Sequence, residues 1–281
     1  MFESHFGFSA PPFQLSPDPS FFFESRGHSH GLAYLKFGVY QAEGFIVVTG
    51  EIGAGKTTLV RALLQGLDHD KIVAAQVTNT QLDTGGLLQA ICAAFGVPAS
   101  ATSKAHLISS LEAYFTALAA THKRALLIVD EAQNLGLKEI EELRMLSNFQ
   151  LGNHPLLQSF LVGQPELRSM LQSKAMEQLR QRVIASCHLG PLDPAETRAY
   201  IEHRLHHVGW KDFPHIADEA FAEIHQHTAG TPRRINLLCN RLLLGAFLRS
   251  RDTVEARDVG DTAAELTAEV GQPGQVQAPL A

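Results

Sequence analysis

Eight consecutive residues offer the clearest chemistry in the chain, because they combine glycines, a lysine and a hydroxyl. The segment Gly50-Glu51-Ile52-Gly53-Ala54-Gly55-Lys56-Thr57 matches G-x-x-x-x-G-K-[ST], and Thr58 follows it. In this pattern the glycines let the backbone curl so that its N–H groups face a phosphate chain. Lys56 would bring positive charge to the β- and γ-phosphate oxygens, and the hydroxyl of Thr57 would bind Mg²⁺. We therefore predict a binding site for ATP and Mg²⁺ at residues 50–58.

A second candidate is an apolar run that ends in two acids. The run Leu126-Leu-Ile-Val129 is followed directly by Asp130 and Glu131. A buried strand with this ending can hold Mg²⁺ through the first carboxylate and orient a water molecule through the second. An apolar strand followed by two acids can also be the start of an ordinary exposed loop. Its pairing with the phosphate loop favours Asp130 as a metal ligand and Glu131 as the catalytic base of an ATPase.

Both motifs need strands whose ends meet, and the surrounding sequence predicts them. Short apolar runs at residues 45–49, 72–77, 126–129 and 157–162 alternate with helical periods at 56–65, 83–95, 103–121, 137–149 and 165–179. This alternation is typical of a mostly parallel sheet covered on both faces. The predicted fold class is therefore α/β: a P-loop NTPase core with three layers.

The two ends of the chain differ from this middle part. Four helical periods at 194–208, 216–227, 232–249 and 254–266 predict an all-helical module without a strand. Seven of the 16 phenylalanines lie in residues 1–25 among four prolines, which favours an ordered strap over a helix or a free tail. We expect the following divisions: the strap and a helix packed on the core at 1–43, the nucleotide-binding core at 44–191, a helical lid at 192–268 and a disordered tail at 269–281.

Bulk composition narrows the choice of partner. The net charge of −6 and the pI near 6.1 disfavour a protein that coats DNA, although a local basic patch stays compatible with them. Three widely spaced cysteines indicate reduced thiols. Neither a signal peptide nor an 18-residue apolar run is evident. We expect a cytoplasmic protein with no direct membrane insertion.

Two further clusters have both a chemical and a structural interpretation. His203, His206 and His207 share one face of a predicted helix, and a solvated basic face is favoured there over a metal site. The strap phenylalanines Phe21 to Phe23 are the best candidates for framing an adenine base. Packing in a core is the expected role for most phenylalanines of the strap.

The phosphate loop, the box Asp130-Glu131-Ala132-Gln133 and the helical module together resemble an AAA+ ATPase. More narrowly, the chain resembles the ExeA, or general secretion pathway protein A, family over about residues 1–266. The branch most similar to it comprises secretion ATPases that accompany exosortase (PEP-CTERM) and exopolysaccharide loci, with pilus-biogenesis ATPases second. The strings that carry the resemblance are Phe6-Gly-Phe8, Pro12-Phe13, Pro17-Asp18-Pro19, Gly44-Phe45, Gly163-Gln164-Pro165-Glu166-Leu167, Leu179-Arg180-Gln181-Arg182 and Gly230-Thr231-Pro232-Arg233-Arg234-Ile235-Asn236.

The resemblance implies roles for three more side chains. Gln164 stands where the family carries a polar sensor that reaches the γ-phosphate or the attacking water; a plain strand-end amide is the alternative. Arg182 stands where AAA+ proteins carry an arginine finger for a neighbouring subunit, and Arg180 is the alternative finger. The other interpretation is a surface helix on which both arginines are solvated. Arg233 matches the second sensor in the lid, and Arg234 could replace it.

The resemblance also implies an assembly and an output. The expected assembly is a homo-oligomer, either a ring such as a hexamer or a filament. The expected output is work on a cell-envelope system for exopolysaccharide, secretion or pilus assembly, through a membrane-embedded partner that would hold the protein at the inner membrane. Two rivals stay open. One is a DNA-associated ATPase of the transposition-regulator or initiator type, and the other is a nucleotide-gated scaffold with very slow turnover.

Overall fold

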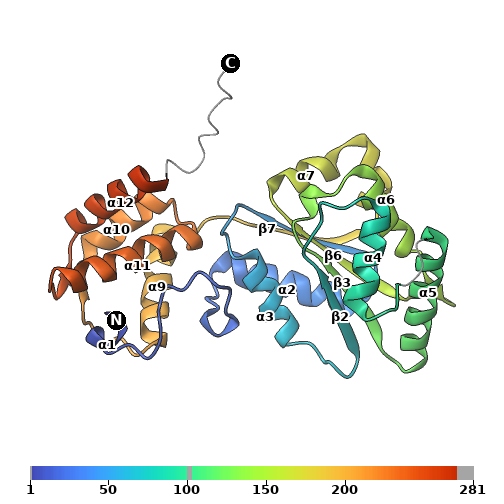
Figure 1. Cartoon of the computed structure of the whole chain (residues 1–281), viewed down its shortest axis with the longest axis horizontal. Coiled ribbons are helices and arrows are strands. Elements are labelled where there is room, and N and C mark those ends of the chain that lie inside the picture. Colours follow the sequence, from blue (N-terminus) through green and yellow to red (C-terminus); the bar gives the residue numbers. More distant parts are fainter. Residues whose placement is uncertain (1, 100–102, 271–281) are drawn as a thin grey trace, which may run out of the picture. The chain divides into compact units, whose positions relative to one another are not determined.

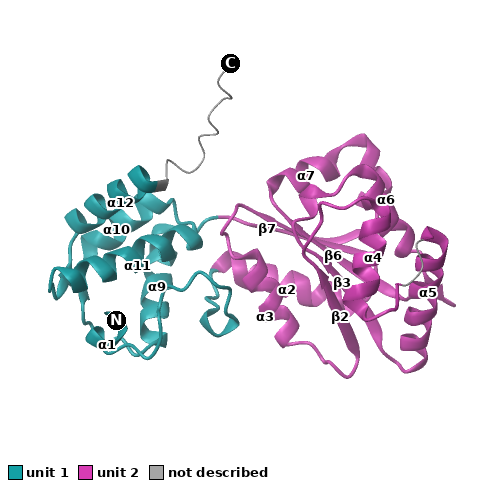
Figure 2. Ribbon diagram, in the orientation of Figure 1, with its two compact units in different colours: residues 1–25, 191–281 teal, residues 26–190 magenta. Residues whose placement is uncertain are grey.

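The computed structural model describes residues 2–99 and 103–270, which divide into two compact units. The first unit to consider is the continuous segment 26–190, drawn in magenta in Figure 2. The other unit combines residues 2–25 with residues 191–270, drawn in teal. Because the two ends of the chain share one unit, the middle segment is an insertion between them.

A five-stranded parallel sheet forms the centre of the 26–190 unit. Its order is β2-β3-β6-β1-β7. Strands buried on both faces read as continuous apolar runs, which is the pattern of β1 and β6. The order makes β6 the neighbour of both β1 and β3, so the carboxyl ends of these three strands lie side by side. The strands are β1 (Phe45–Gly50), β2 (Ile72–Val77), β3 (Arg124–Val129), β6 (Leu157–Gly163) and β7 (Val183–Leu189).

Helices cover both faces of this sheet, as Figure 1 shows. Successive side chains of a strand point to opposite faces. Phe45 and Val47 therefore join the larger apolar cluster with α4, α5, α6 and α7, whereas Ile46 faces α2. The helices are α2 (Arg26–Gln41), α3 (Lys56–Gln65), α4 (Thr84–Phe95), α5 (Lys104–Ala120), α6 (Leu137–Leu146) and α7 (Pro165–Gln172).

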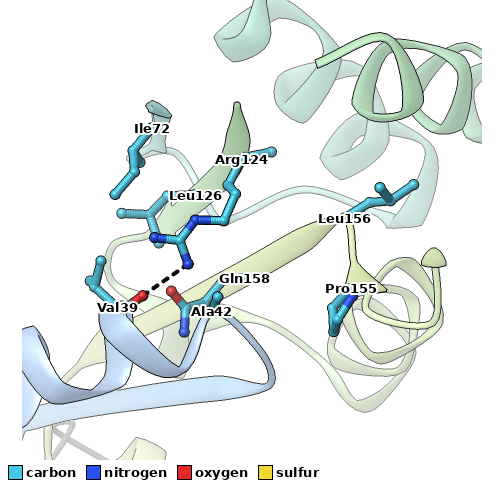
Figure 3. Close-up of a pocket in the computed structure, with 9 residues that line it drawn as sticks. Val39, Ala42, Ile72, Arg124, Leu126, Pro155, Leu156 and Gln158 are labelled. Atoms are coloured by element: carbon cyan, nitrogen blue, oxygen red, sulfur yellow. Dashed lines mark hydrogen bonds between the residues drawn. The ribbon is translucent and has the colours of Figure 1, made fainter. Parts of the chain in front are cut away.

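Helix α2 is fastened to the sheet at its carboxyl end. The last carbonyls of a helix lack partners within the helix. Here Gln158 Nε2 donates to Gly38 O at 2.7 Å and to Glu43 O at 3.0 Å, and Arg124 Nη1 donates to Val39 O at 3.1 Å. Figure 3 shows Arg124 reaching across a small pocket to Val39. Side chains from β3 and β6 thus hold the end of α2 in place.

The sheet unit contains elements that the sequence patterns did not predict. Strand β7 lies at the sheet edge beside β1, and a short antiparallel pair, β4 (Gln150–Leu151) and β5 (His154–Pro155), precedes β6. The helix expected at 165–179 is broken, because Ser173 takes an extended backbone conformation. The 3₁₀ turns η2 (Ala132–Asn134) and η3 (Lys174–Met176) and helix α8 (Glu177–Arg180) complete this unit.

The other unit is mainly helical, as expected, but it contains a strand pair. The two-residue strands β8 (His215–Ile216) and β9 (Thr253–Val254) pair in parallel, so the prediction of a module without a strand is wrong. Its remaining elements are α1 (Phe2–Phe6), η1 (Pro19–Phe21), α9 (Pro194–His207), α10 (Asp218–Thr228), α11 (Pro232–Leu248) and α12 (Ala256–Val270).

The strap, residues 2–25, belongs to the helical unit, which corrects the expectation that it packs on the nucleotide-binding core. The helix expected in the same division, α2, does pack on the sheet. Five of its phenylalanines are buried in the apolar cluster of α9, α10, α11 and α12. The buried guanidinium of Arg204 donates to the carbonyls of Pro12 and Gln14, and Ser9 N donates to Val208 O at 2.9 Å. These bonds satisfy two strap carbonyls and one strap N–H group that burial would otherwise leave unpaired. Of the expected tail, residues 269–270 end α12, and the remainder lies outside the described residues.

Candidate nucleotide site

The phosphate loop lies between β1 and α3, as its motif requires. Strand β1 ends at Gly50 and helix α3 begins at Lys56. Gly53 and Gly55 have φ angles of 83° and 95°, in the left-handed region that glycine adopts without strain. A side chain at Gly50 would come within 2.6 Å of Leu189 O on the neighbouring strand β7. The loop therefore needs glycine at these three positions to take this shape.

Lys56 lies beneath this loop. Its side chain is buried, and its Nζ donates to Gly50 O at 2.7 Å and to Glu51 O at 3.0 Å. Burial lowers the pKa of Lys56, and the negative charges of Glu131 and Asp130 oppose that effect. The ammonium group is thus close enough to both acids to interact with them. Thr57 and Thr58 follow in the first turn of α3, each partly buried.

Asp130 and Glu131 lie at the carboxyl end of β3. Asp130 Oδ1 accepts from Glu131 N at 3.0 Å, and Oδ2 accepts from Gln76 Nε2 at 3.4 Å. Burial raises the pKa of Asp130 above its usual value, because an anion is poorly solvated there. Glu131 has φ 51° and ψ 38°, an unusual left-handed conformation for a residue with a side chain, and Thr80 Oγ1 donates to its carbonyl at 2.9 Å.

Two glutamines hold the carboxylate of Glu131. Gln133 Nε2 donates to Glu131 Oε2 at 2.6 Å, and Gln164 Nε2 donates to the same oxygen at 3.2 Å. Gln133 Oε1 also accepts from Gln164 N at 3.0 Å. A β-carbon at position 163 would lie 2.7 Å from Gln133 Oε1, so this contact favours glycine there. Gln133 therefore links the ends of β3 and β6, a role that the sequence analysis missed although the residue lies in the acidic box.

Of the two arginine-finger candidates, Arg182 lies far from this site within the unit, whereas Arg180 lines a pocket together with Thr49 and His188. Arg182 directly precedes β7, whose opposite end pairs with Gly50 at the phosphate loop. At about 3.3 Å per residue, the seven residues of the strand place Arg182 roughly 20 Å away. Its Nη1 donates to Ser147 Oγ at 2.9 Å, whereas Arg180 Nη1 donates to Leu171 O and Gln172 O at 3.4 and 3.2 Å. Arg182 therefore cannot reach the phosphate loop of its own chain.

The second-sensor candidates belong to the helical unit. Arg233 is exposed and Arg234 partly buried in the first turn of α11. One turn later, Asn236 Oδ1 accepts from the Tyr200 hydroxyl at 2.8 Å, and that hydroxyl accepts from Arg204 Nη1 at 2.9 Å. The first turn of α11 is thus tied to α9 and, through Arg204, to the strap.

Two other candidate clusters have structural partners. Phe21 packs on His207 with ring centroids 4.3 Å apart, and Phe23 packs on Tyr200 at 5.7 Å. His206 instead contacts Trp210 at 5.2 Å. Among the described residues, no group of three or more His, Cys, Asp or Glu side chains is arranged to hold a metal ion. Phe21, Phe23 and His206 thus each pack against another ring of the helical unit.

Known proteins resemble this chain in both sequence and fold. The family model of the AAA domain matches residues 39–171, which include β1, the phosphate loop, β3 and β6. General secretion pathway protein A of Aeromonas hydrophila is 38% identical over 268 residues, or 95% of this chain. The chain is an AAA+ protein related to general secretion pathway protein A. It spans about half of that relative, 49% of its length.

Solved structures of AAA+ proteins share the fold. The Aeropyrum pernix ORC1 protein in complex with DNA has a TM-score of 0.69 at 16% identity, with 93% of this chain and 70% of that chain covered. The Thermotoga maritima RuvB Holliday junction branch migration motor has a TM-score of 0.59 at 21% identity, with 89% and 72% covered. At such identities the likeness concerns the fold alone. The predicted fold class is confirmed: an AAA+ α/β core with a parallel sheet, and helices after it.

Within residues 2–99 and 103–270, no helix has the length and apolar character that a bilayer crossing requires.

Proposed function

We propose that this AAA+ protein binds ATP with Mg²⁺ at the phosphate loop and hydrolyses it. One observation carries the proposal: Lys56, Asp130, Glu131 and Gln164 come from the ends of three adjacent strands and interact with one another. Burial raises the pKa of Asp130 because it disfavours the carboxylate anion, and a bound divalent cation would stabilise that anion. Asp130 and Thr57 offer the oxygen ligands that Mg²⁺ prefers.

Each side chain then has a role in phosphoryl transfer. Residues 50–58 would hold the β- and γ-phosphates through backbone N–H groups, the Lys56 ammonium and the Thr57 hydroxyl. Bound Mg²⁺ would neutralise charge on the β- and γ-phosphate oxygens. Glu131 would orient a water molecule toward the γ-phosphorus and accept its proton, and Gln164 would fix both that carboxylate and the phosphate. The products are ADP and phosphate.

The active form proposed here is a homo-oligomer, either a ring such as a hexamer or a filament. Arg182 lies too far from its own phosphate loop to act there, which supports donation to the nucleotide of a neighbouring subunit. Such a finger typically accelerates hydrolysis by about 10³-fold or more. Arg233, at the start of α11, would contact the γ-phosphate as the second sensor when the helical unit closes on the nucleotide.

The proposed output is energy or switching for a cell-envelope assembly or export system. The name of the relative, general secretion pathway protein A, supports this class of output. Exopolysaccharide export and pilus assembly are the narrower proposals. A membrane-embedded partner would hold the cytoplasmic protein at the inner membrane.

A DNA-associated ATPase is the second candidate, favoured by the fold it shares with a DNA-bound ORC1 structure. The arginines of the helical unit argue against it. Arg241 pairs with Glu269 at 2.6 Å, and Arg251 pairs with Asp258 at 2.6 Å. Arg249 also approaches Asp258, at 3.7 Å. Paired arginines leave less positive charge for phosphate contacts, and the net charge of the chain is −6.

The test is phosphate release by the purified protein, with and without DNA and lipid vesicles. We expect Mg²⁺-dependent turnover in the wild-type protein. Glu131→Gln should abolish turnover while ATP binding persists. Lys56→Ala should abolish both turnover and ATP binding. Glu112→Gln, a change of an exposed carboxylate on α5, is the matched control. Wild-type protein without turnover in any oligomeric state would refute the proposal. Activity that rises several-fold with DNA and falls steeply with salt would establish the second candidate.

Mixing experiments test the arginine finger. Arg182→Ala and Glu131→Gln subunits should each be inactive alone, and their mixture should regain activity because some interfaces then combine one intact finger with one intact base. Arg180→Ala is the matched control and should stay active. A protein that is monomeric with every nucleotide, or a mixture without recovery, contradicts donation between subunits.

A further inference from the structure

His28 is a buried side chain outside the phosphate-loop motif that nevertheless contacts the loop. It lies in the first turn of α2 and is only 6% exposed. Its Nε2 lies 3.1 Å from Ala54 O. A carbonyl oxygen can only accept a hydrogen bond, so Nε2 must carry a proton and donate it. The imidazole also occupies the space beside Gly55, where a β-carbon would come within 2.6 Å of Nε2.

This hydrogen bond determines the direction of one N–H group in the loop. In a trans peptide the C=O and N–H bonds lie in one plane and point in opposite directions. Because Ala54 O points toward His28, the N–H of Gly55 points away from α2. Gly55 has φ 95°, and glycine favours neither sign of φ, so the backbone here offers little resistance to a change of orientation. The donor on His28 therefore selects one orientation of the Ala54–Gly55 peptide.

Helix α2 is a rigid support for this donor. Gly31 and Gly38 lie on the same face as His28 and allow close packing: a β-carbon at Gly31 would touch Leu59 of α3 at 3.2 Å, and one at Gly38 would overlap Ile46 of β1. The carboxyl end of the helix is held by Gln158 and Arg124 from β6 and β3 (Figure 3). The position of His28 is thus determined by the same sheet that carries the loop.

We propose that His28 is a positioning residue for nucleotide binding. By fixing the Ala54–Gly55 peptide, it aims the Gly55 N–H at the β-phosphate before the nucleotide arrives. The preorganised loop then loses less conformational freedom on binding. This inference rests on the proposed function, because it assumes that the loop binds ATP and ADP. The Ala54–Gly55 peptide that His28 orients is assigned here to the β-phosphate, which ATP and ADP share, so the effect of His28 falls on affinity rather than on the chemical step.

The experiment compares two substitutions of similar length, His28→Gln and His28→Met. The glutamine amide can replace the Nε2 donor, whereas the methionine thioether cannot. Equilibrium binding of ADP and ATP to the full chain is measured by calorimetry or fluorescence. For His28→Met we expect about five- to tenfold weaker binding of both nucleotides, the loss that one buried hydrogen bond typically brings. We expect His28→Gln to bind within about twofold of wild type, the spread of context effects on one retained hydrogen bond.

Turnover separates positioning from general damage. For His28→Met, KM for ATP should rise while kcat at saturating ATP stays near that of wild type. His30→Leu, a change of the exposed histidine two residues along α2, is the matched control and should leave both constants unchanged. Equal ADP affinity in the methionine variant and wild type, or equal weakening by glutamine and methionine, would overturn the inference. Wild-type protein that binds no nucleotide would instead refute the proposed function.

Discussion

Gln133 offers a sharp test of the hydrolytic site, because one side chain links the proposed base to the proposed sensor. Its amide donates to Glu131 Oε2 and accepts from Gln164 N. Gln133→Ala removes both hydrogen bonds and leaves a small space at the surface of β6. The carboxylate of Glu131 then keeps only the donor from Gln164 Nε2, at 3.2 Å. We expect the carboxylate to sample orientations in which it no longer faces the water.

The size of the effect follows from these contacts. A hydrogen bond to a charged group contributes about 1.5–3 kcal/mol, and each 1.36 kcal/mol corresponds to a factor of ten in rate. Because the second amide remains, the lower half of that range applies, and kcat should fall about 10- to 45-fold. KM for ATP should change little, because the hydrogen bonds of Gln133 are to Glu131 and Gln164, at the ends of β3 and β6, and not to the phosphate loop. Gln89→Ala, on the exposed side of α4, serves as the control.

The pH dependence of turnover in a Gln133→Glu variant is a second test of the contact between residue 133 and Glu131. At pH 7.5 the introduced carboxylate would face that of Glu131, so turnover should fall further than in the alanine variant. As the pH approaches about 4.3, the ordinary glutamate pKa, the introduced group regains a proton to donate. Its activity relative to wild type should therefore rise toward low pH. A Gln133→Ala variant with wild-type kcat, or with a raised KM and an intact kcat, would refute the positioning of Glu131 by Gln133.

Two further predictions concern stability. Burial raises the pKa of Asp130, so there is a pH range in which the folded protein retains a proton that the unfolded chain loses. The free energy of unfolding therefore falls as the pH rises from the ordinary aspartate pKa of about 3.9 through the raised value. Asp130→Asn should raise the Tm of nucleotide-free protein at pH 7 and abolish turnover; a lower Tm at pH 7, or a gain that persists below pH 3.9, would contradict this cause. Phe13 is 2% exposed in the helical unit, so Phe13→Ala should reduce the free energy of unfolding by about 3–5 kcal/mol in denaturant titrations. Phe37→Ala, at a site 53% exposed, should cost far less, and equal losses would show that the strap is not packed in this way.

The parts of the fold that the sequence predicted are those with strong local signals. The helix 56–65 and the strand 72–77 match their predicted bounds, because apolar period and flanking residues agree there. Strand β7 was missed, since an edge strand beside α2 alternates between buried and exposed residues and includes Ser186 and His188. The break at Ser173 was missed because helical periodicity continues across it.

Long-range pairing explains the other differences. The strap phenylalanines were expected to be buried, but apolar side chains do not specify which surface buries them. Their partners on α9 and α11 follow about 170 to 245 residues later in the sequence. The role of Gln133 depends on strand order: β6 must lie beside β3 for its amide to reach Gln164. His28 was visible only as one of 14 histidines until α2 was placed against the phosphate loop.

The division of the chain has a consequence for the order of folding. Residues 26–190 form a continuous unit, whereas the strap must wait for residues 191–270 to leave the ribosome before its apolar partners exist. At about 5–20 residues per second, synthesis of the intervening segment takes on the order of ten seconds or more. During that time the phenylalanines of the strap have no helical unit to pack against and are exposed to aggregation or to chaperones. A fragment of residues 1–190 should therefore combine a protease-resistant sheet unit with a protease-sensitive amino terminus.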